Sequence, residues 1–253
     1  MKRSKNLLLP EGAIKVNLPA LSGYSPQRLR KRSALLTQLS LTNTHQIPGG
    51  SISVPAPDLP QPTDYSCALA AASIARMYGV GPDSMEEFMQ GMNTGVNGTS
   101  PANIVRYLNR LGLRANIQRR MTREMLMNLL DKQISTVLDI QAWAKDRSVY
   151  ADTNKNDNGH YVAAIGYSQE APQLLAADGS RKTLGTDSRE TYFYFMDPSI
   201  LCRYGFLPWS ELDRRWHDDE GTEDKPKPNW HMGIVIRPNG QKPVHASMAE
   251  FIA

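Results

Sequence analysis

The hydrophobic pattern of the chain changes period near residue 131, and this change constrains the fold more than any other feature. Before it, apolar residues recur at helical spacing, whereas after it they form short runs rich in β-branched and aromatic residues. Helices first and strands second are typical of an α+β domain. We therefore predict an α+β fold in which N-terminal helices pack on an antiparallel sheet.

Local signals mark the predicted helices and strands. Gly79 can end an Ala-rich helix, Ser84 and Glu87 form a capping box, and Ser100-Pro101 supplies an N-cap and a first helical position. The predicted helices span 67–78, a segment after Ser84, a segment from Ser100 to Gly112, and 122–130. The predicted strands span 134–140, 161–167, 191–196 and 232–236.

The first 59 residues differ from the rest in composition. They contain six prolines, the pair Gly49-Gly50 and one weakly helical, basic stretch at 29–41. We predict an irregular, basic, Pro-containing N-terminal arm or leader at 1–59. One compact domain at 60–240 and a C-terminal tail at 241–253 complete the predicted organisation.

Net charge separates the arm from the domain. Residues 1–50 hold eight Lys and Arg against one Glu, a net charge of +7, while the remaining 203 residues hold 21 basic and 24 acidic residues, a net charge of −3. Because a nucleic-acid-binding domain carries its positive charge on the folded part, we expect no nucleic-acid partner. An acidic partner and a membrane surface are the contacts left open for the basic arm.

Neither a membrane span nor a secretion signal is expected. No apolar run approaches the roughly 20 residues that cross a bilayer, and the apolar stretch at 7–9 is too short for a signal peptide. The two cysteines, Cys67 and Cys202, exclude a disulfide framework and a four-cysteine zinc site, which favours a reducing compartment. We expect a cytoplasmic protein, or one exported by a non-Sec route, with Cys202 as a structural thiol.

The segment from Gln61 to Ala72 carries the strongest chemical signal. Cys67 begins a predicted helix, where unpaired backbone N–H groups and the helix dipole favour a thiolate over a thiol. Its own N–H and the side chain of Gln61, six residues upstream, are two donors that could hold the oxyanion of an attacked carbonyl. The alternative is that Cys67 is a small buried residue at the start of an Ala-rich helix.

A thiol nucleophile needs a histidine base, and the chain has five histidines. His45 lies in the arm and His245 near the C-terminus. His217 lies in a run of charges that predicts a solvated helix end. His160 and His231 each precede an apolar strand, so either could project from a strand end into a cleft.

His160 is the preferred base because an acid follows it at a suitable place. The next predicted strand ends at Asp197-Pro198, and adjacent antiparallel strands would bring the Asp197 carboxylate to the His160 ring. No comparable acid follows His231. An ordinary strand-edge histidine and an ordinary turn stay open when each residue is taken alone. Taken together, in the order Gln, Cys, His, Asp, the residues favour a catalytic site.

Beyond these residues, a series of short motifs runs through residues 60–238. They are Arg76-Met77-Tyr78-Gly79, Ser100-Pro101, Gly159-His160-Tyr161-Val162, Gly166-Tyr167, Tyr194-Phe195-Met196-Asp197-Pro198, Trp209-Ser210-Glu211-Leu212 with Trp216, and Gly233-Ile234-Val235-Ile236. With Gln61 six residues before Cys67, this series resembles the papain-like double-glycine cysteine peptidases, the type that processes bacteriocin leaders, and their stand-alone relatives.

The resemblance implies a papain-like fold with Cys67 as nucleophile, His160 as base, Asp197 as orienting acid and Gln61 as oxyanion donor. It implies a cysteine peptidase that acts on a peptide or protein substrate, with cleavage after double-glycine sites, and needs no metal or organic cofactor. Many members follow the cysteine with Gly-Pro, where this chain has Ala68-Leu69. That departure leaves the substrate specificity open.

Two other functions stay open on sequence grounds. Cys-dependent acyltransferases, such as transglutaminases or deamidases that act as toxins or effectors, use the same order of Cys, His and Asp. A peptide-binding module on the same fold would need no reactive thiol. Gly49-Gly50, just upstream of the predicted domain, is a further candidate site of processing by this or a sister enzyme.

Overall fold

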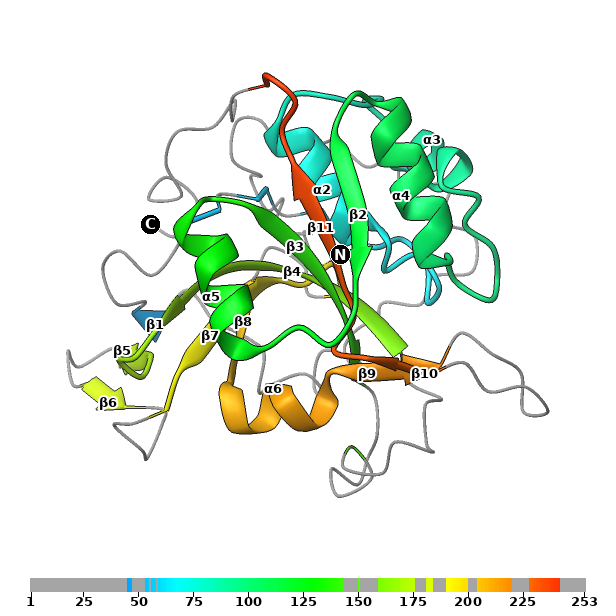
Figure 1. Ribbon diagram of the computed structural model, residues 1–253. Helices are drawn as coiled ribbons and strands as arrows, with labels where there is room; N and C mark the ends of the chain where they lie inside the picture. The colour runs from blue at the N-terminus through cyan, green and yellow to red at the C-terminus, as the bar shows by residue number, and fades with distance from the viewer. Residues whose placement is uncertain are drawn as a thin grey trace, which may run out of the picture.

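The structure is a computed structural model, and it combines helices with an antiparallel sheet (Figure 1). The described residues are 45–46, 53–54, 56–57, 59–142, 150, 159–175, 181–183, 190–199, 204–219 and 228–241. The predicted α+β fold, with N-terminal helices packed on an antiparallel sheet, is confirmed.

The predicted helices form, and three of them have their expected start. The first was predicted to begin at Cys67 but begins at Leu69, because Cys67 and Ala68 form the preceding turn. The side chains of Ser84, Ser100 and Thr122 each accept a hydrogen bond from the backbone N–H three residues further on. The predicted third helix ends at Arg110, two residues before Gly112. The helices are α2 (Leu69–Met77), α3 (Met85–Gly91), α4 (Pro101–Arg110), α5 (Arg123–Asp131) and α6 (Trp209–Arg215).

The main sheet has six strands in the order β2-β11-β3-β4-β7-β8, and every neighbouring pair is antiparallel. Its strands are β2 (Arg114–Gln118), β3 (Ser135–Gln141), β4 (Gly159–Ser168), β7 (Tyr192–Met196), β8 (Tyr204–Pro208) and β11 (Gly233–Arg237). The four strands predicted from sequence are the four central ones. The strands at the two edges, β2 and β8, were not predicted.

Two smaller antiparallel sheets flank the main one. One has the order β1-β5-β6, and the other pairs β10 with β9. Their strands are β1 (His45–Gln46), β5 (Gln173–Leu175), β6 (Arg181–Thr183), β9 (His217–Asp219) and β10 (Pro228–Trp230).

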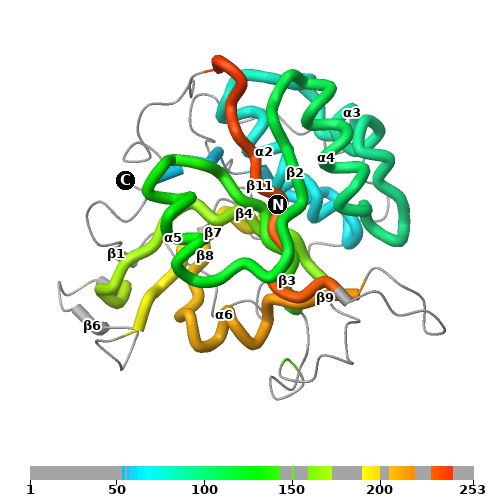
Figure 2. Tube along the Cα trace, viewed as in Figure 1, coloured from blue at the N-terminus to red at the C-terminus, as the bar shows by residue number. Residues whose placement is uncertain are grey.

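Helix α2 is the most enclosed helix of the described chain. It packs on β3 and β4 and contacts α3 and α4, which gather beside it in Figures 1 and 2. Of its nine residues, all except Arg76 are buried. Helix α5 also packs on β3 and β4, and α6 packs on β3 and β8. The segment that carries Cys67 therefore leads directly into the centre of the core.

The last part of the predicted arm contributes to this core. Val54, Ala56 and Leu59 are all buried in it. The backbone N–H groups of Ser53 and Val54 both donate to the carbonyl oxygen of Ile165 at 2.9 Å, at the irregularity in the pairing of β4 with β7. The core thus reaches back at least to Val54, while a division of the chain at 59 and 60 stays a prediction. Gly49-Gly50 and the stretch at 29–41 lie outside the described residues.

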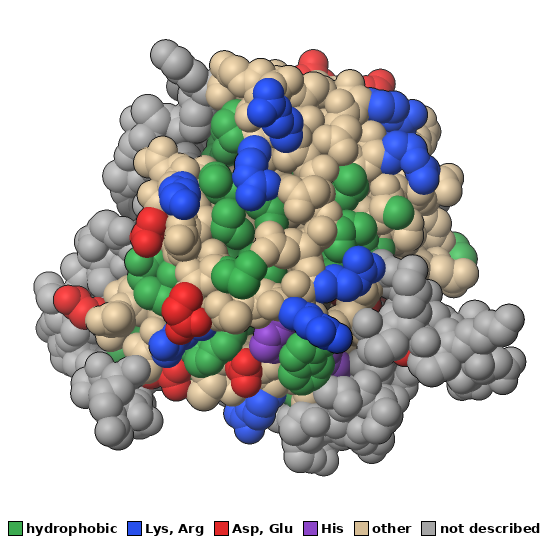
Figure 3. All heavy atoms as spheres, viewed as in Figure 1, with side chains coloured by type: hydrophobic (Ala, Val, Ile, Leu, Met, Phe, Trp, Pro, Cys, Tyr) green, Lys and Arg blue, Asp and Glu red, His purple; other side chains and the backbone are tan. Residues whose placement is uncertain are grey.

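The outer surface mixes side chains of different kinds. On the face drawn in Figure 3, acidic and basic side chains lie among hydrophobic and neutral ones. Over the ranges that the structure describes, no helix has the length and apolar character that crossing a membrane would require.

Candidate active site

Cys67 lies in the turn that leads into α2, two residues before the helix begins. The N–H of Leu69 donates to the carbonyl of Ser66 at 3.1 Å, and the N–H of Ala70 donates to the carbonyl of Cys67 at 3.0 Å. The thiol is partly buried and forms no disulfide. In the described part of the chain, the backbone N–H of Cys67 donates to no other group. A donor at this position can therefore bind an oxygen that is placed next to the sulfur.

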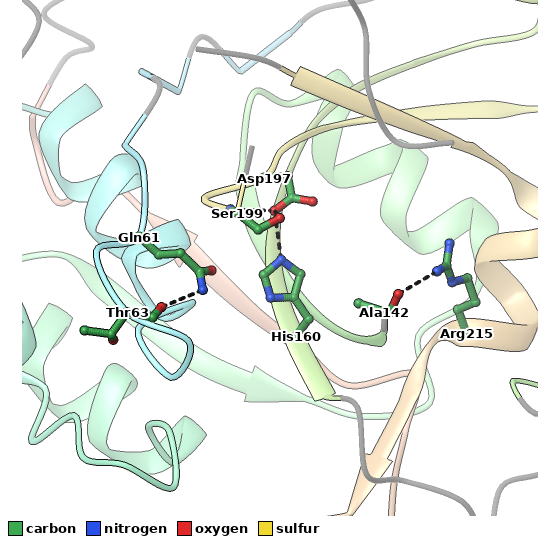
Figure 4. A network of polar contacts seen from close by, with 7 residues as sticks. All are labelled: Gln61, Thr63, Ala142, His160, Asp197, Ser199 and Arg215. Carbon is green, nitrogen blue, oxygen red and sulfur yellow. Dashed lines mark hydrogen bonds and ion pairs between the residues drawn. The ribbon is translucent and has the colours of Figure 1, made fainter. Parts of the chain in front are cut away.

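His160 and Asp197 come from neighbouring central strands. His160 lies at the start of β4, and Asp197 directly follows β7, which pairs antiparallel with β4. The Nε2 atom of His160 lies 2.8 Å from Oδ1 of Asp197 (Figure 4). Both side chains are almost completely shielded from solvent, with 1% and 0% exposed. The pairing of two strands thus brings together two residues that lie 37 positions apart in the sequence.

Ser199 holds the carboxylate of Asp197 in place. Its backbone N–H and its hydroxyl both donate to Oδ1 of Asp197, at 2.9 and 2.6 Å, and Figure 4 shows the three side chains together. With the His160 bond, this oxygen faces three donors. Sequence reasoning missed Ser199, although an Asp two residues before a Ser is a common signal for a side-chain-capped turn.

His160 contacts Cys67 as well as Asp197. Burial lowers the pKa of His160, but the charge of Asp197 and the hydrogen bond to it, with the hydrogen bond and charge of Cys67, raise it from 6.5 to about 9. Because Nε2 faces Asp197, Nδ1 is the ring nitrogen left for the thiol. The ring therefore lies between a thiol and a carboxylate, in surroundings that favour its charged form.

Gln61 lies beside the end of β7. Its backbone N–H donates to the carbonyl oxygen of Pro198 at 2.7 Å, so the main chain of Gln61 is fixed next to Asp197. Its amide Nε2 donates to the carbonyl of Thr63 at 2.7 Å (Figure 4). The side chain is 5% exposed. The structure thus brings together all four residues that the sequence singles out as a site.

A second buried polar cluster lies next to this site. The carboxyl group of Asp218 on β9 accepts from Nε2 of Gln141 at 3.1 Å and shares a hydrogen bond with Asp139. Burial raises the pKa of Asp218 to about 6, against hydrogen bonds from Asp219, Asp139 and Gln141 that lower it. The same carboxyl group lies against Gly159, the residue before His160. This cluster was not predicted.

The prediction that His217 lies on a solvated helix end is wrong. His217 is in β9, only 2% exposed, and its Nε2 lies 2.7 Å from the carbonyl oxygen of Tyr150. The acidic residues Asp218 and Asp219 suggested a solvated segment. Pairing of β9 with β10 places the histidine beneath Trp230, with the two rings stacked at 5.6 Å.

His231, the other strand-end candidate, has a structural environment of its own. Its ring is stacked between Trp216 and Trp230, with centroids 5.0 and 4.8 Å away. Its Nδ1 lies 3.0 Å from the carbonyl oxygen of Met121. The His231 ring therefore packs within a cluster of aromatic side chains. Cys202 and His245 lie outside the described residues.

The site has the parts that nucleophilic acyl chemistry uses. A thiol lies next to an imidazole, the imidazole is held by a carboxylate, and a backbone N–H and an amide lie nearby as donors. Within the ranges described, no group of three or more His, Cys, Asp and Glu residues could hold a metal ion.

The solved structures that are similar to this chain include a peptidase domain and a protease. No family model matches the sequence, and no curated protein matches it. The peptidase domain of Streptococcus ComA, a bifunctional ABC transporter involved in a quorum-sensing pathway, is 17% identical with a TM-score of 0.43 over 72% of this chain and 97% of that one. A double-glycine-motif protease from an AMS/PCAT transporter, solved with its leader peptide, is 16% identical with a TM-score of 0.45 over 77% of this chain and 99% of that one.

Proposed function

We propose that this protein is a cysteine peptidase that uses Cys67 as nucleophile, His160 as general acid and base, Asp197 as the orienting acid and Gln61 as an oxyanion donor. The observation that carries the proposal is the buried contact of 2.8 Å between His160 and Asp197, with the Cys67 thiol at the same ring. A carboxylate so placed fixes the ring and stabilises its charged form. In this arrangement the imidazole of His160 can act first as a general acid and then as a general base.

The reaction begins when the Cys67 thiolate attacks the carbonyl carbon of a peptide bond. A carbon–sulfur bond forms, and the carbonyl oxygen takes up the negative charge, which the N–H of Cys67 and the amide of Gln61 stabilise. The carbon–nitrogen bond then breaks, and the proton on His160 passes to the leaving amine. A thioester between Cys67 and the acyl half of the substrate results.

Water completes the cycle. The now neutral imidazole of His160 takes a proton from water as the oxygen attacks the thioester carbon. The carbon–sulfur bond breaks, the thiolate leaves, and the imidazole again carries its second proton. Asp197 keeps Nε2 of His160 oriented throughout. We propose a peptide as the substrate, with cleavage after a glycine pair as the first specificity to test.

Cleavage of a peptide library that includes Gly-Gly sequences tests the proposal. Wild type, Cys67→Ala and Cys202→Ser are incubated with the library and the products identified by mass spectrometry. We expect products with wild type and Cys202→Ser and none with Cys67→Ala. The absence of any product that depends on Cys67 would overturn the peptidase proposal.

Two further arms separate the other functions that the sequence leaves open. Addition of an amine donor to a Gln-containing peptide detects acyl transfer, since incorporation of the amine without cleavage is the result of a transferase. The rate of alkylation of Cys67 by iodoacetamide near pH 6 detects a binding module. A rate no higher than that of a free thiol would mean that no thiolate is stabilised beside His160.

A further inference from the structure

One buried hydroxyl, that of Ser66, forms hydrogen bonds across the turn between Gln61 and Cys67. Ser66 is completely buried, with 0% exposed. Its Oγ accepts from the backbone N–H of Thr63 at 3.0 Å and from the Thr63 hydroxyl at 2.9 Å, and it donates to the Thr63 carbonyl at 3.1 Å. A single hydroxyl thus contacts three polar groups of one residue, and together they fix the conformation of the turn.

The Thr63 carbonyl connects this turn to the amide of Gln61. The same carbonyl oxygen accepts from Nε2 of Gln61 at 2.7 Å. The main chain of Gln61 is held separately, by its N–H bond to Pro198. Gln61 therefore has two attachments, one from its main chain to the strand end that carries Asp197 and one from its side-chain amide to Thr63. Only the second depends on Ser66.

Ser66 is also directly bonded to the nucleophile's residue. It precedes Cys67 in the chain, and its carbonyl accepts the N–H of Leu69, which opens α2. The backbone N–H of Cys67 and the amide of Gln61 are the two donors of the proposed oxyanion site. Ser66 shares a peptide bond with Cys67. Through the Thr63 carbonyl, it also holds the amide of Gln61.

We propose that Ser66 is a positioning residue that sets the Gln61 amide relative to the Cys67 N–H, acting through the Thr63 carbonyl. The inference rests on the proposed function, because it assigns the two donors to an oxyanion. Stabilisation of an oxyanion depends on donors placed in advance at close to hydrogen-bond distance, and a displacement of about 1 Å can cost a large factor in rate. Loss of the Ser66 hydroxyl removes the group that keeps Thr63 and hence the amide in place.

Two small reagents distinguish this role from a general effect on the thiol. p-Nitrophenyl acetate acylates a thiolate through a tetrahedral oxyanion, with release of nitrophenolate. Iodoacetamide alkylates the same sulfur by displacement of iodide, without an oxyanion. We expect Ser66→Ala to lower the acylation rate of Cys67 about tenfold while the alkylation rate stays within about twofold of wild type. Equal losses of both rates, or no loss of either, would overturn the inference.

A double-mutant cycle tests whether Ser66 acts through Gln61. Gln61→Ala removes the amide, so adding Ser66→Ala to it should lower acylation no further. Additive losses would mean that Ser66 acts by another route and would overturn the inference.

Ser66→Thr keeps the hydroxyl and should restore the wild-type ratio of acylation to alkylation. If Ser66→Ala does not fold, Thr63→Val, which removes one of the three contacts, should lower the ratio in the same direction, and an unchanged ratio would contradict the proposal.

Two controls complete the experiment. Ser84 makes the same kind of contact, from its hydroxyl to the N–H of Glu87 at the start of α3, so Ser84→Ala should lower stability without changing the ratio. Cys67→Ala separates the two proposals. If the burst of nitrophenolate persists in Cys67→Ala, the proposed nucleophile is wrong. If the burst depends on Cys67 but not on Ser66, only the positioning role fails.

Discussion

The carboxyl group of Asp218 lies directly against the α-carbon of Gly159, the residue before His160. A β-carbon built on Gly159 would overlap this carboxyl group. A side chain at residue 159 would therefore displace the Asp218 carboxyl group from its hydrogen bond with Gln141. The position of the proposed base thus depends on a close contact one residue away from it.

Replacement of Gly159 by alanine should disturb both stability and reactivity. We expect Gly159→Ala to lower the free energy of unfolding by about 1–3 kcal/mol, because the displaced Asp218 carboxyl group loses its hydrogen bonds, and to slow alkylation of Cys67. Chemical denaturation and the iodoacetamide rate measure the two effects. In the double variant Gly159→Ala, Asp218→Ala the overlap is relieved, so the two substitutions should cost less together than the sum of their separate effects. A simple sum would contradict the contact.

The buried carboxyl of Asp218 predicts a pH-dependent stability. Because burial raises its pKa from 3.8 to about 6, the folded state holds this proton more tightly than the unfolded state. The stabilisation that this provides is fully present below 3.8 and is lost as the pH rises through about 6. Asp218→Asn, which is neutral at every pH, should therefore raise the melting temperature at pH 8 relative to wild type and bring less gain at pH 4. Asp83→Asn, at an exposed position paired with Arg76, serves as the control and should show no such difference.

Removal of the charge on Asp197 should move the titration of His160. The imidazolium is fully present below 6.5 and is lost as the pH rises through about 9, with Asp197 as the main group that raises the pKa. Asp197→Asn keeps the shape of the side chain, so His160 should lose its proton at a lower pH. NMR titration of the imidazole measures the midpoint, and kcat should fall by roughly 100-fold or more. An unchanged midpoint in Asp197→Asn would contradict the pairing, and Asp213→Asn, near His231, is the control.

Arg215 should be needed for stability, unlike its neighbour on the same helix. Its buried guanidinium donates to the carbonyl of Ala142 at 3.3 Å (Figure 4). It also donates to the carbonyl of Gln141 at 2.9 Å and pairs with Glu211 at 3.0 Å. Arg215→Met retains much of the volume but leaves these groups without their donor, which should cost about 2–4 kcal/mol in urea unfolding. Arg214→Met, at an exposed position, should cost less than about 0.5 kcal/mol. Equal costs would refute the structural role.

Two valines test whether the core includes the segment before residue 60. Val54 is 1% exposed and Val96 is 79% exposed. Val54→Ala should lower the free energy of unfolding by about 1–2 kcal/mol through loss of buried methyl groups, and Val96→Ala should leave it nearly unchanged. Thermal or chemical denaturation of both variants decides the matter, and a neutral Val54→Ala would place the segment outside the cooperative fold.

The strands that the sequence predicts are those with continuous apolar runs. The central strands β3 and β7 are buried along their whole length, so their sequences contain the continuous apolar runs from which a strand can be predicted. The edge strand β2 has buried Ala115 between exposed Arg114 and Asn116, so it has no continuous apolar run. Strand β8 contains Gly205 and Pro208, two residue types that argue against a strand. These two strands form because each pairs with a neighbouring strand, β11 or β7. A short stretch of sequence does not show which distant segment will pair with it.

The site follows a similar division. Cys67, His160 and Asp197 could be proposed from sequence because their side chains have chemistry that few other residue types share. Ser66 and Ser199 act through hydrogen bonds whose partners are fixed only in the folded turn, and serine is common in all turns. His217 is the opposite case, because its sequence context gave a wrong prediction. The charged residues around it predict a solvent-exposed segment, but the pairing of β9 with β10 shields it from solvent.

Strand β11 lies between β2 and β3, so a late segment of the chain joins two earlier ones. A chain that has been synthesised as far as Asp197 holds Gln61, Cys67, His160 and Asp197, yet it lacks the strand that closes their sheet. On the ribosome, the proposed peptidase therefore completes its fold only after residue 237 has been added. The order of the strands in the sheet therefore makes closure of the sheet a late event in the synthesis of the described residues.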